Sequence, residues 1–348
     1  MFKQMETDSL EQLHFFSDPS TELRAIVAIH NTQRGPALGG CRFIPYSTTN
    51  EAITDAIRLA KGMSYKAALA GLPFGGGKAV IIQPDTIKDR HALMRSFGQS
   101  IHSMNGQYIT AMDSGTLVDD MDDIAQQTNF VSCTRHMGDP SPATARGVLA
   151  GIRANLKYTT GSDILKGRHI AIQGLGHVGL SLATQLHNAG SHLTVTDIDD
   201  NKMLLARQQL NADICSPEEI YGINCDVFSP CGLGAVINSE TISRLRCGSI
   251  AGSANNQLEA PEMGLQLKQR NILYAPDYVI NSGGLMFVAM RYQQLTDVAI
   301  SNKIAGIFDT LSDIYLDAKQ DNRVISDIAD QRALEIIQQS GPNQFQAA

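Results

Sequence analysis

Short apolar segments recur along the chain, and between them apolar residues take up a helical spacing. In the first part, the segments Ala25 to Ile29, Ala79 to Ile82 and Tyr108 to Ala111 have the length and composition of buried strands. A helix is predicted from Asn50, the expected N-cap, because one apolar face follows it, made of Ala52, Ile53, Ala56, Ile57, Leu59 and Ala60. This alternation predicts an α/β domain over residues 1–137.

A run of helix breakers, Gly138-Asp139-Pro140-Ser141-Pro142, predicts a hinge after this domain. Beyond it five strands are predicted, each followed by a loop rich in Gly, Pro or Asn: His169 to Gln173, His192 to Thr196, Asp226 to Ser229, Ser249 to Ala251 and Ile272 to Ala275. Strands that alternate with helices form a parallel sheet, and ligands bind beyond the carboxyl ends of its strands. Residues 138–319 are therefore predicted to form a doubly wound domain of the Rossmann type.

The chain after Gly284 has a helical pattern to its end. Its apolar positions are spaced for one buried face and comprise Ile304, Ile307, Leu311, Ile314 and Leu316. We expect the last helix, about residues 320–348, to pack back on the first domain.

Length and composition agree with two globular domains. The chain has 348 residues, of which 43% are hydrophobic and 18% charged, and it carries a net charge of -7. Its lysines and arginines are scattered, which argues against nucleic acid as a partner. No apolar run approaches the roughly 18 residues that span a bilayer, and the N-terminus lacks a signal-peptide pattern. We therefore expect a cytoplasmic protein without a membrane partner.

The cysteine and histidine patterns predict no metal site. The six cysteines form no C-x-x-C pair, and the nine histidines form no H-E-x-x-H motif. We expect reduced and mostly buried thiols.

The sequence Gly174-Leu175-Gly176-His177-Val178-Gly179 follows a predicted strand directly and opens a helix. In this context the first glycine makes a tight turn, the second admits a pyrophosphate, and the third allows close packing of helix and strand. Asp197 ends the next strand about twenty residues later, where an acid binds the ribose. The acidic run after it disfavours a 2'-phosphate, so the pattern predicts NAD rather than NADP as the cofactor. His177 has the position of a spacer that faces solvent.

The first domain holds two candidate catalytic residues. Lys78 follows Gly75-Gly76-Gly77 on what is predicted to be flexible backbone beside an apolar strand, a setting that suits a general base. Asp113 ends another strand, where a carboxylate can exchange protons with a substrate. A nucleotide triphosphatase is disfavoured because Leu72 and Ala79 replace residues that a phosphate-binding loop requires.

Together these segments resemble the glutamate/leucine/phenylalanine/valine dehydrogenase family over nearly the whole chain. The similar motifs are Leu38-Gly39-Gly40-Cys41-Arg42, Gly62-Met63-Ser64-Tyr65-Lys66, Gly75-Gly76-Gly77-Lys78, Ser141-Pro142-Ala143-Thr144, Gly252-Ser253-Ala254-Asn255-Asn256-Gln257 and Tyr278-Val279-Ile280-Asn281-Ser282-Gly283-Gly284. Within the family the chain is most similar to the leucine enzymes. The resemblance implies NAD-dependent, reversible oxidative deamination of an apolar L-amino acid to its 2-oxo acid and ammonia, in a cleft between the domains.

The resemblance also implies residue roles. Lys66 and the backbone of Gly39 and Gly40 would bind the substrate carboxylate, Lys78 would activate water, and Asp113 would exchange protons with the amino nitrogen. The cofactor would contact Arg42, Thr144, the loop residues Gly174, Leu175, Gly176, His177, Val178, Gly179 and Leu180, and then Asp197, Cys231, Asn255, Asn256 and Asn281. The family further implies a homo-oligomer that forms through the first domain.

The family pattern also bears on substrate choice. Glutamate enzymes carry a lysine before the Gly-Gly pair and a serine seven residues after the asparagine of N-x-G-G, where this chain has Leu38 and Val288. With Met63 these residues would form an apolar pocket that prefers leucine and other branched-chain substrates. Ser114 and Asp139 depart from the pattern of the leucine enzymes, so phenylalanine, valine or another apolar amino acid remains open.

Two alternatives to a dehydrogenase are a non-catalytic regulator and an enzyme of another class. A non-catalytic NAD-binding regulator would need the glycine loop but would have no use for Lys66, Lys78 and Asp113 together. A methyltransferase also uses a glycine loop and a strand-end acid, but it would not require the first domain.

Overall fold

The computed structural model describes residues 2–339 and divides them into two compact units. The first unit contains residues 2–139, 288–296 and 332–339, and the second contains residues 140–287 and 297–331. The first boundary, between Asp139 and Pro140, falls inside the predicted hinge. None of the helices in the described part of the chain is long and apolar enough to cross a membrane. The functional roles given to the two domains stay predictions.

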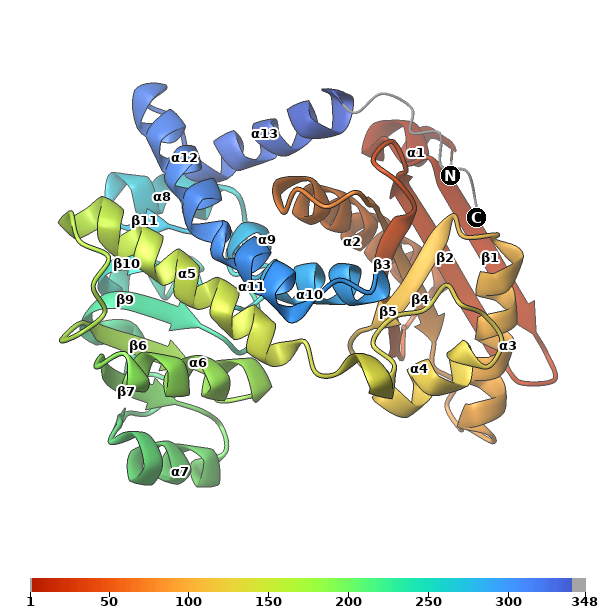
Figure 1. Ribbon diagram of the computed structural model, residues 1–348, viewed down its shortest axis with the longest axis horizontal. Coiled ribbons are helices and arrows are strands. Elements are labelled where there is room, and N and C mark those ends of the chain that lie inside the picture. Colours follow the sequence, from red (N-terminus) through yellow and green to blue (C-terminus); the bar gives the residue numbers. More distant parts are fainter. Residues whose placement is uncertain (1, 340–348) are drawn as a thin grey trace. The chain divides into compact units, whose positions relative to one another are not determined.

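The first unit is built on a five-stranded mixed sheet with the order β1-β2-β4-β3-β5 (Figure 1). The strands are β1 (Gln12–Asp18), β2 (Leu23–Asn31), β3 (Ala37–Ile44), β4 (Gly75–Ile82) and β5 (Tyr108–Met112). Strands β3, β4 and β5 run parallel, while β1 and β2 are antiparallel to their neighbours. The three predicted strands are confirmed as β2, β4 and β5. The pattern missed β1, which is only partly buried, and β3, whose Gly-Gly pair resembles a turn.

Helices cover both faces of this sheet. They are α1 (Phe2–Asp8), α2 (Thr49–Leu69), α3 (Arg90–Ser103) and α4 (Val118–Ala125). The predicted apolar face of α2 packs on Val80 and Ile82, although Leu59 is only half-buried. Arg90 of α3 lies over the ring of Phe43, on the opposite face. The N-cap prediction was wrong by two residues, because Thr48 and not Asn50 accepts the hydrogen bond that starts α2.

The second unit holds a six-stranded parallel sheet with the order β11-β10-β9-β6-β7-β8. Its strands are β6 (His169–Gln173), β7 (His192–Thr196), β8 (Asp213–Ile214), β9 (Asn224–Pro230), β10 (Arg246–Ile250) and β11 (Leu273–Tyr274). All five predicted strands are present, and β8 was missed because it has only two residues. The chain reverses its order between β6 and β9, and in such sheets the ligand crevice lies at this switch point.

The helices of the second unit are α5 (Ser141–Thr160), α6 (His177–Asn188), α7 (Asp200–Leu210), α8 (Glu262–Gln269), α9 (Asp277–Ile280), α11 (Asp297–Ala305) and α12 (Ile307–Gln320). One face of the sheet is covered by α8 and by the 3-10 turns Ile220–Gly222 and Ile242–Arg244, which share a core with Phe228 and Ile250. Two further helices, α10 (Gly283–Tyr292) and α13 (Ile325–Gln339), contribute residues to both units.

The helical tail was predicted correctly in type but not in detail. Ile304, Ile307, Leu311 and Ile314 are buried, whereas Leu316 is 60% exposed and does not belong to the buried face. Tyr315 is buried instead, because it follows Leu311 at the four-residue spacing of the buried face of α12, whereas Leu316 lies off that face. Within the predicted last helix, α13 ends at Gln339, and residues 340–348 lie outside the described part of the chain.

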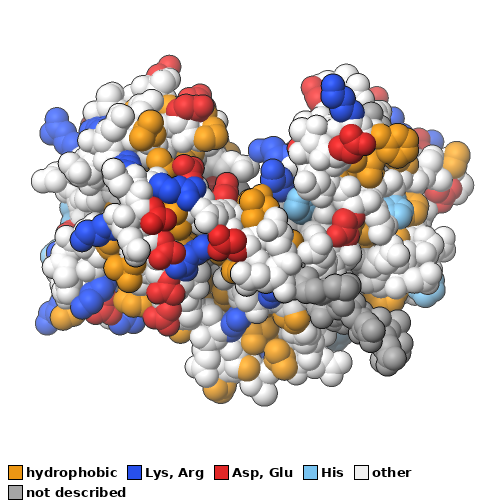
Figure 2. All heavy atoms as spheres, turned by 90° about the horizontal axis from the view of Figure 1, so that it is seen from above, with side chains coloured by type: hydrophobic (Ala, Val, Ile, Leu, Met, Phe, Trp, Pro, Cys, Tyr) orange, Lys and Arg blue, Asp and Glu red, His pale blue; other side chains and the backbone are white. Residues whose placement is uncertain are grey.

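On the face drawn in Figure 2, acidic and basic side chains are interspersed. The six cysteines carry free thiols, and four of them are buried: Cys41, Cys133, Cys225 and Cys247.

Candidate active site

The three glycines before Lys78 belong to strand β4 and are buried, so the expectation of flexible backbone was wrong. A Cβ added to Gly76 would come within 2.0 Å of the Ser64 nitrogen on α2, and one added to Gly77 would come within 2.8 Å of the Tyr108 ring. The glycines therefore let a helix and a neighbouring side chain lie directly on the strand. Lys78, which follows them, is held on a rigid element and is 5% exposed.

Lys78 forms an ion pair with Asp113, which follows β5 as predicted. The Arg42 Nε lies 3.4 Å from the same carboxylate oxygen of Asp113, and Arg42 Nη1 lies 2.7 Å from Asp55 Oδ2. Burial alone would raise the pKa of Asp113. The charge and hydrogen bond of Lys78, aided by the charge of Arg42, outweigh burial and hold this pKa below its ordinary value. The structure thus brings the two predicted catalytic residues together, with the carboxylate ionised.

The loop that carries Asp113 is fixed by residues that the sequence did not single out. The Asp113 amide donates to Thr116 Oγ1 at 2.9 Å, and Thr116 Oγ1 donates to the Cys41 carbonyl at 3.1 Å. Arg90 donates to the Gly115 carbonyl at 2.7 Å and to both oxygens of Asp120 at 2.6 Å. Asp120 is 2% exposed. No local sequence motif predicts this contact, because Arg90 and Asp120 are thirty positions apart in the sequence.

Two of the predicted substrate residues, Gly39 and Gly40, lie beside this pair. Gly40 lies on β3, where an added Cβ would come within 2.7 Å of the Asp113 Cβ, and a Cβ on Gly39 would meet the Gly77 carbonyl at 1.8 Å. Lys66 lies on α2 two residues after Ser64, which contacts Gly76.

The predicted pocket residues also belong to the first unit. Leu38 on β3 is 1% exposed and Val288 on α10 is 8% exposed, while Met63 on α2 is half-buried. The Val288 carbonyl accepts a hydrogen bond from Ser132 at 3.2 Å. All three side chains offer apolar surface.

The glycine loop of the second unit has the predicted strand-turn-helix form. Gly174 adopts a φ of +97°, in the left-handed region that favours glycine. A Cβ on Gly179 would come within 2.0 Å of the Gly174 carbonyl, while one on Gly176 would meet nothing within 4 Å. Gly176 is the N-cap of α6 and provides no side-chain cap, so the first amides of the helix are available to an anion. His177 is exposed, as expected of a spacer; Leu175 is buried, and Val178 and Leu180 are half-buried.

Asp197 follows β7 and holds the glycine loop in place. Its carboxylate accepts hydrogen bonds from the amides of Leu175 at 2.5 Å and Asp199 at 2.9 Å. Lys202 Nζ lies 3.9 Å from Asp197 Oδ1. The predicted ribose acid thus also has a structural contact with the loop, which the spacing of the motif did not reveal.

Cys231, Asn255 and Asn256 lie on loops that follow strands of this sheet, and Asn281 is the C-cap of α9. The Cys231 amide donates to the Gln173 carbonyl at 2.7 Å, and the Cys231 Cβ lies 3.2 Å from where a Cβ on Gly179 would be. Asn281 Nδ2 donates to Asn255 Oδ1 at 2.7 Å, which ties two predicted cofactor residues together. Asn256 has a left-handed backbone with a φ of +51° and is exposed.

Thr144 lies in the first turn of α5, where its hydroxyl donates to the Pro140 carbonyl at 3.2 Å. A Cβ on Gly284 would come within 2.4 Å of this hydroxyl, so Thr144 lies beside the segment that follows Asn281. Arg42, the remaining predicted cofactor residue, belongs to the first unit, where it is engaged with Asp55 and Asp113.

The second unit fits a dinucleotide on three counts. The open space at Gly176 admits a ligand, and the uncapped start of α6 suits its phosphates. In addition, the buried oxygens Gln173 Oε1, Thr196 Oγ1 and Asn281 Oδ1 accept no hydrogen bond from any described residue. Among residues 2–339, no group of three or more His, Cys, Asp or Glu side chains is arranged to hold a metal ion.

Comparisons with known proteins agree on one family. The profile of the Glu/Leu/Phe/Val dehydrogenase dimerisation domain matches residues 11–130, and that of the Glutamate/Leucine/Phenylalanine/Valine dehydrogenase matches residues 194–331. The chain is 46% identical over 343 residues to leucine dehydrogenase of Geobacillus stearothermophilus, covering 97% of this chain and 93% of that protein. It is 40% identical over 342 residues to phenylalanine dehydrogenase of Thermoactinomyces intermedius, covering 96% of this chain and 93% of that protein.

A solved structure gives the same result. The crystal structure of L-tryptophan dehydrogenase from Nostoc punctiforme matches with a TM-score of 0.88 and 38% identity, covering 98% of this chain and 99% of that one.

Proposed function

The chain belongs to the Glu/Leu/Phe/Val dehydrogenase family, and on this premise we propose that it catalyses the reversible, NAD-dependent oxidative deamination of leucine. The products are the 2-oxo acid and ammonia, and other branched-chain amino acids are alternative substrates. The proposal places the enzyme in branched-chain amino-acid catabolism.

The observation that carries the proposal is the buried contact between Lys78 and Asp113. Asp113 accepts a proton from the substrate amino group and returns it to the departing ammonia. Lys78 first loses its ammonium proton to solvent and then takes the proton of the water that adds to the imine carbon. As an ammonium again, it stabilises the negative charge that develops on the oxygen. A proton can pass between the two residues because the ammonium and carboxylate are in direct contact.

NAD is the proposed cofactor, and it accepts the hydride that leaves the α-carbon. Gly174, Gly176 and the start of α6 would hold its pyrophosphate, and Asp197 its ribose. The negative charge of Asp197 would repel the 2'-phosphate of NADP. Asn281 has a buried side-chain oxygen to which no described residue donates, which supports a contact with the nicotinamide amide.

The proposed substrate site uses Lys66 and the β3 glycines for the α-carboxylate, and Leu38, Met63 and Val288 for the side chain. Glutamate would place a second carboxylate against apolar surface, and an unpaired buried charge costs several kcal/mol. We therefore expect glutamate to be rejected by about a thousandfold in kcat/KM, since roughly 4 kcal/mol corresponds to that factor. The dimerisation domain matched by residues 11–130 supports a homo-oligomer.

The test is a comparison of 2-oxo acids. Purified protein with NADH and ammonia should consume NADH rapidly with 4-methyl-2-oxopentanoate, more slowly with phenylpyruvate, and negligibly with 2-oxoglutarate. The same reaction with NADPH should be much slower. Absence of turnover with every oxo acid would contradict the enzyme and favour a non-catalytic NAD-binding regulator.

An aromatic preference is the second candidate. It is favoured by the similarity to the phenylalanine and tryptophan dehydrogenases. Faster turnover with phenylpyruvate than with 4-methyl-2-oxopentanoate would decide for it, because the two acids differ only in their side chains.

A further inference from the structure

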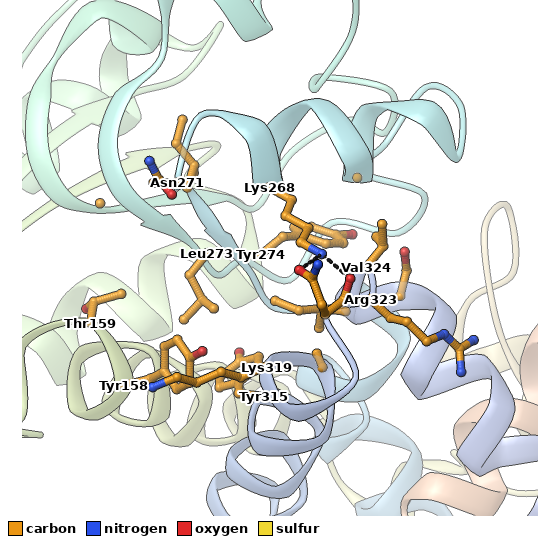
Figure 3. Close-up of a pocket in the computed structure, with 17 residues that line it drawn as sticks. Tyr158, Thr159, Lys268, Asn271, Leu273, Tyr274, Tyr315, Lys319, Arg323 and Val324 are labelled. Atoms are coloured by element: carbon orange, nitrogen blue, oxygen red, sulfur yellow. Dashed lines mark hydrogen bonds between the residues drawn. The ribbon is translucent and has the colours of Figure 1, made fainter.

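The second unit contains a cavity that neither the proposed reaction nor the dinucleotide crevice uses. Its volume is about 610 Å³, within the range of small-molecule sites. It lies between the end of α5, helices α8 and α12, the β10 and β11 edge of the sheet, and the turn at residues 322–326 (Figure 3). The dinucleotide crevice lies instead at the switch point between β6 and β9.

The charges that line the cavity are all positive. They belong to Lys268, Lys319 and Arg323, and the lining includes no Asp or Glu, although the chain as a whole carries a charge of -7. Figure 3 shows the Arg323 side chain directed away from the other lining residues, and its guanidinium donates to Gln331. The two lysines therefore supply the positive charge that a ligand would meet.

The two lysines differ in what they contact. Lys268 Nζ donates to the side-chain oxygen of Asn322 at 2.9 Å and to the Asn322 carbonyl, so it fixes one wall of the cavity. The Lys319 ammonium has no hydrogen bond or ion pair with any residue between 2 and 339. Lys319 is exposed and extends toward Tyr158 in Figure 3. It is thus available to pair with an anion.

Aromatic rings form the apolar part of the lining. Tyr158 is 41% exposed and packs edge-on against Tyr315, with ring centroids 5.4 Å apart and an angle of 62°. Tyr315 is fixed beneath it, because its hydroxyl donates to the buried Asn155. The exposed ring of Tyr158 offers a surface on which a planar ligand can stack.

We propose that this cavity binds a small organic anion that joins a planar ring to a negatively charged group. The ring stacks on Tyr158, and the anionic group pairs with Lys319 and with the remaining N–H of Lys268. Both features are required, because a charge alone stays hydrated on an exposed lysine and a ring alone leaves the cations unpaired.

The probe for this site is 1-naphthyl phosphate, with inorganic phosphate and 1-naphthol as its separate halves. Calorimetric titration is done on the full chain with saturating NAD, so that the dinucleotide crevice is filled. We expect 1-naphthyl phosphate to bind at one site per chain and at least about tenfold more tightly than either half. Tyr158→Trp adds the only tryptophan of the chain, and its fluorescence should change on binding.

Variants then locate the site. Lys319→Gln and Tyr158→Ala should each weaken the probe about tenfold, while Lys166→Gln, at an exposed lysine outside the cavity, should leave it unchanged. None of these residues belongs to the proposed catalytic site, so turnover of 4-methyl-2-oxopentanoate should persist in all three variants. If the wild type itself does not turn over 4-methyl-2-oxopentanoate, the proposed function is refuted, but the binding test of the cavity remains valid.

Several outcomes would overturn the proposal. These are equal affinity of wild type and Lys319→Gln, competition of the probe with NAD, and binding of 1-naphthol as tight as that of the phosphate. Binding of the probe only after dilution of the protein to its monomer would mean that a second copy of the chain covers the cavity. This result would also refute the proposal.

Discussion

The two glycine clusters of this chain, Gly75 to Gly77 and the loop that begins at Gly174, have different structural roles. Gly75 to Gly77 lie in an extended, buried strand, and the space of each missing side chain is taken by protein atoms, such as the Ser64 nitrogen beside Gly76. In the second unit Gly174 makes a left-handed turn, and Gly176 leaves its space open. Glycine thus brings protein against protein in the first unit, whereas in the second unit Gly174 and Gly179 are also closely packed and Gly176 alone of these three leaves the backbone accessible.

The helices that contact these clusters, α2 and α6, also differ at their N-terminal ends. In α2 the Thr48 hydroxyl caps the helix by accepting from the Glu51 amide at 3.2 Å. In α6 the N-cap is Gly176, which has no side chain to do so. The first unit presents side-chain chemistry, Lys78 and Asp113, although its buried Arg42 Nε and Thr110 Oγ1 also lack a hydrogen-bond partner among the described residues. The second unit leaves helix amides and buried oxygens unsatisfied, which suits a site completed by a ligand.

The largest effect is expected from Lys78→Ala. The substitution removes the group proposed to act on the attacking water, and loss of such a group typically lowers kcat by about 10²- to 10⁴-fold. KM should change much less, because the lysine acts mainly in the transition state. Steady-state kinetics with 4-methyl-2-oxopentanoate measures both constants. Lys88→Ala, at a lysine that is 76% exposed, is the control and should retain wild-type rates. Near wild-type turnover of Lys78→Ala at saturating substrate would contradict its role.

The contrast between the glycine clusters is tested by a pair of substitutions. Gly76→Ala forces a Cβ against the backbone of α2 and should cost about 3 kcal/mol of unfolding free energy, at the upper end of overpacking effects. Gly176→Ala meets no protein atom, so the melting temperature should hold while KM for NAD rises. Thermal unfolding and NAD titration are compared on both variants. If Gly176→Ala destabilises the protein as much as Gly76→Ala, the two clusters do not differ as described.

The second unit was more predictable from sequence than the first, for a physical reason. Its β6 carries the continuous apolar run Ile170 to Ile172, and β7 alternates Leu193 and Val195 with threonines. Glycine and polar turns bound both strands, so their ends were predicted to the residue. Parallel strands buried on both faces produce such runs. In the first unit β3 contains Gly39 and Gly40, whose lack of side chains hides the strand, and the apparent loop before Lys78 is a strand for the same reason.

The site was predictable where one residue type is required at a fixed spacing. This applies to Gly174, Gly176 and Asp197. Lys78 and Asp113 were candidates from their places beside predicted strands, and the resemblance to the family added their specific roles. The residues that position Asp113 could not be found, because Arg90 and Asp120 meet only through the packing of α3 against α4. The cavity beside Tyr158 was also invisible, since four separate segments of chain line it.

Acid should destabilise the first unit through His30. This ring is 5% exposed and bonds Ser64 Oγ at 2.8 Å, and burial lowers its pKa to about 4, with the charge of Lys61 adding to the effect. An unfolded histidine takes up its proton near pH 6.5. Between about pH 6.5 and 4 the unfolded state therefore binds more protons than the folded state. As the pH is lowered through this window, the unfolding free energy falls by up to about 3 kcal/mol.

Urea unfolding at a series of pH values, with His30→Gln beside the wild type, isolates this contribution. The difference between the two proteins should grow as the pH rises through the window. His91 is the matched control, because its hydrogen bond to Asp123 raises its pKa, so its contribution is present at low pH and fades as the pH rises. Parallel pH profiles of His30→Gln and wild type would show that His30 is not held neutral by burial.

Substitutions of Asp197 test the proposed cofactor site of the second unit. Asp197→Ala should weaken NAD by about ten- to a hundredfold, because a hydrogen bond to a charged group contributes about 1.5 to 3 kcal/mol. Asp197→Asn retains an oxygen for the Leu175 amide but loses the charge, so it should keep the loop and still relax the preference against NADP. Asp213→Ala, at an exposed residue of β8, is the control. A wild-type enzyme that uses NADP as well as NAD would refute the assignment of Asp197.

The smallest effect is expected at the capped helix start of the first unit. Thr48→Ala removes the hydroxyl that accepts from the Glu51 amide, and loss of an N-cap side chain costs about 1 kcal/mol. Asn50→Ala is the matched control, because Asn50 is exposed and lies inside the first turn, where its side chain caps nothing. Urea unfolding should thus separate Thr48→Ala from wild type by about 1 kcal/mol and leave Asn50→Ala close to it. Since α2 also carries Lys66, a loosened start of this helix should raise KM for the oxo acid slightly while kcat holds. Equal destabilisation by the two substitutions would mean that the cap is not what anchors α2, and the contrast with the uncapped α6 would lose its basis.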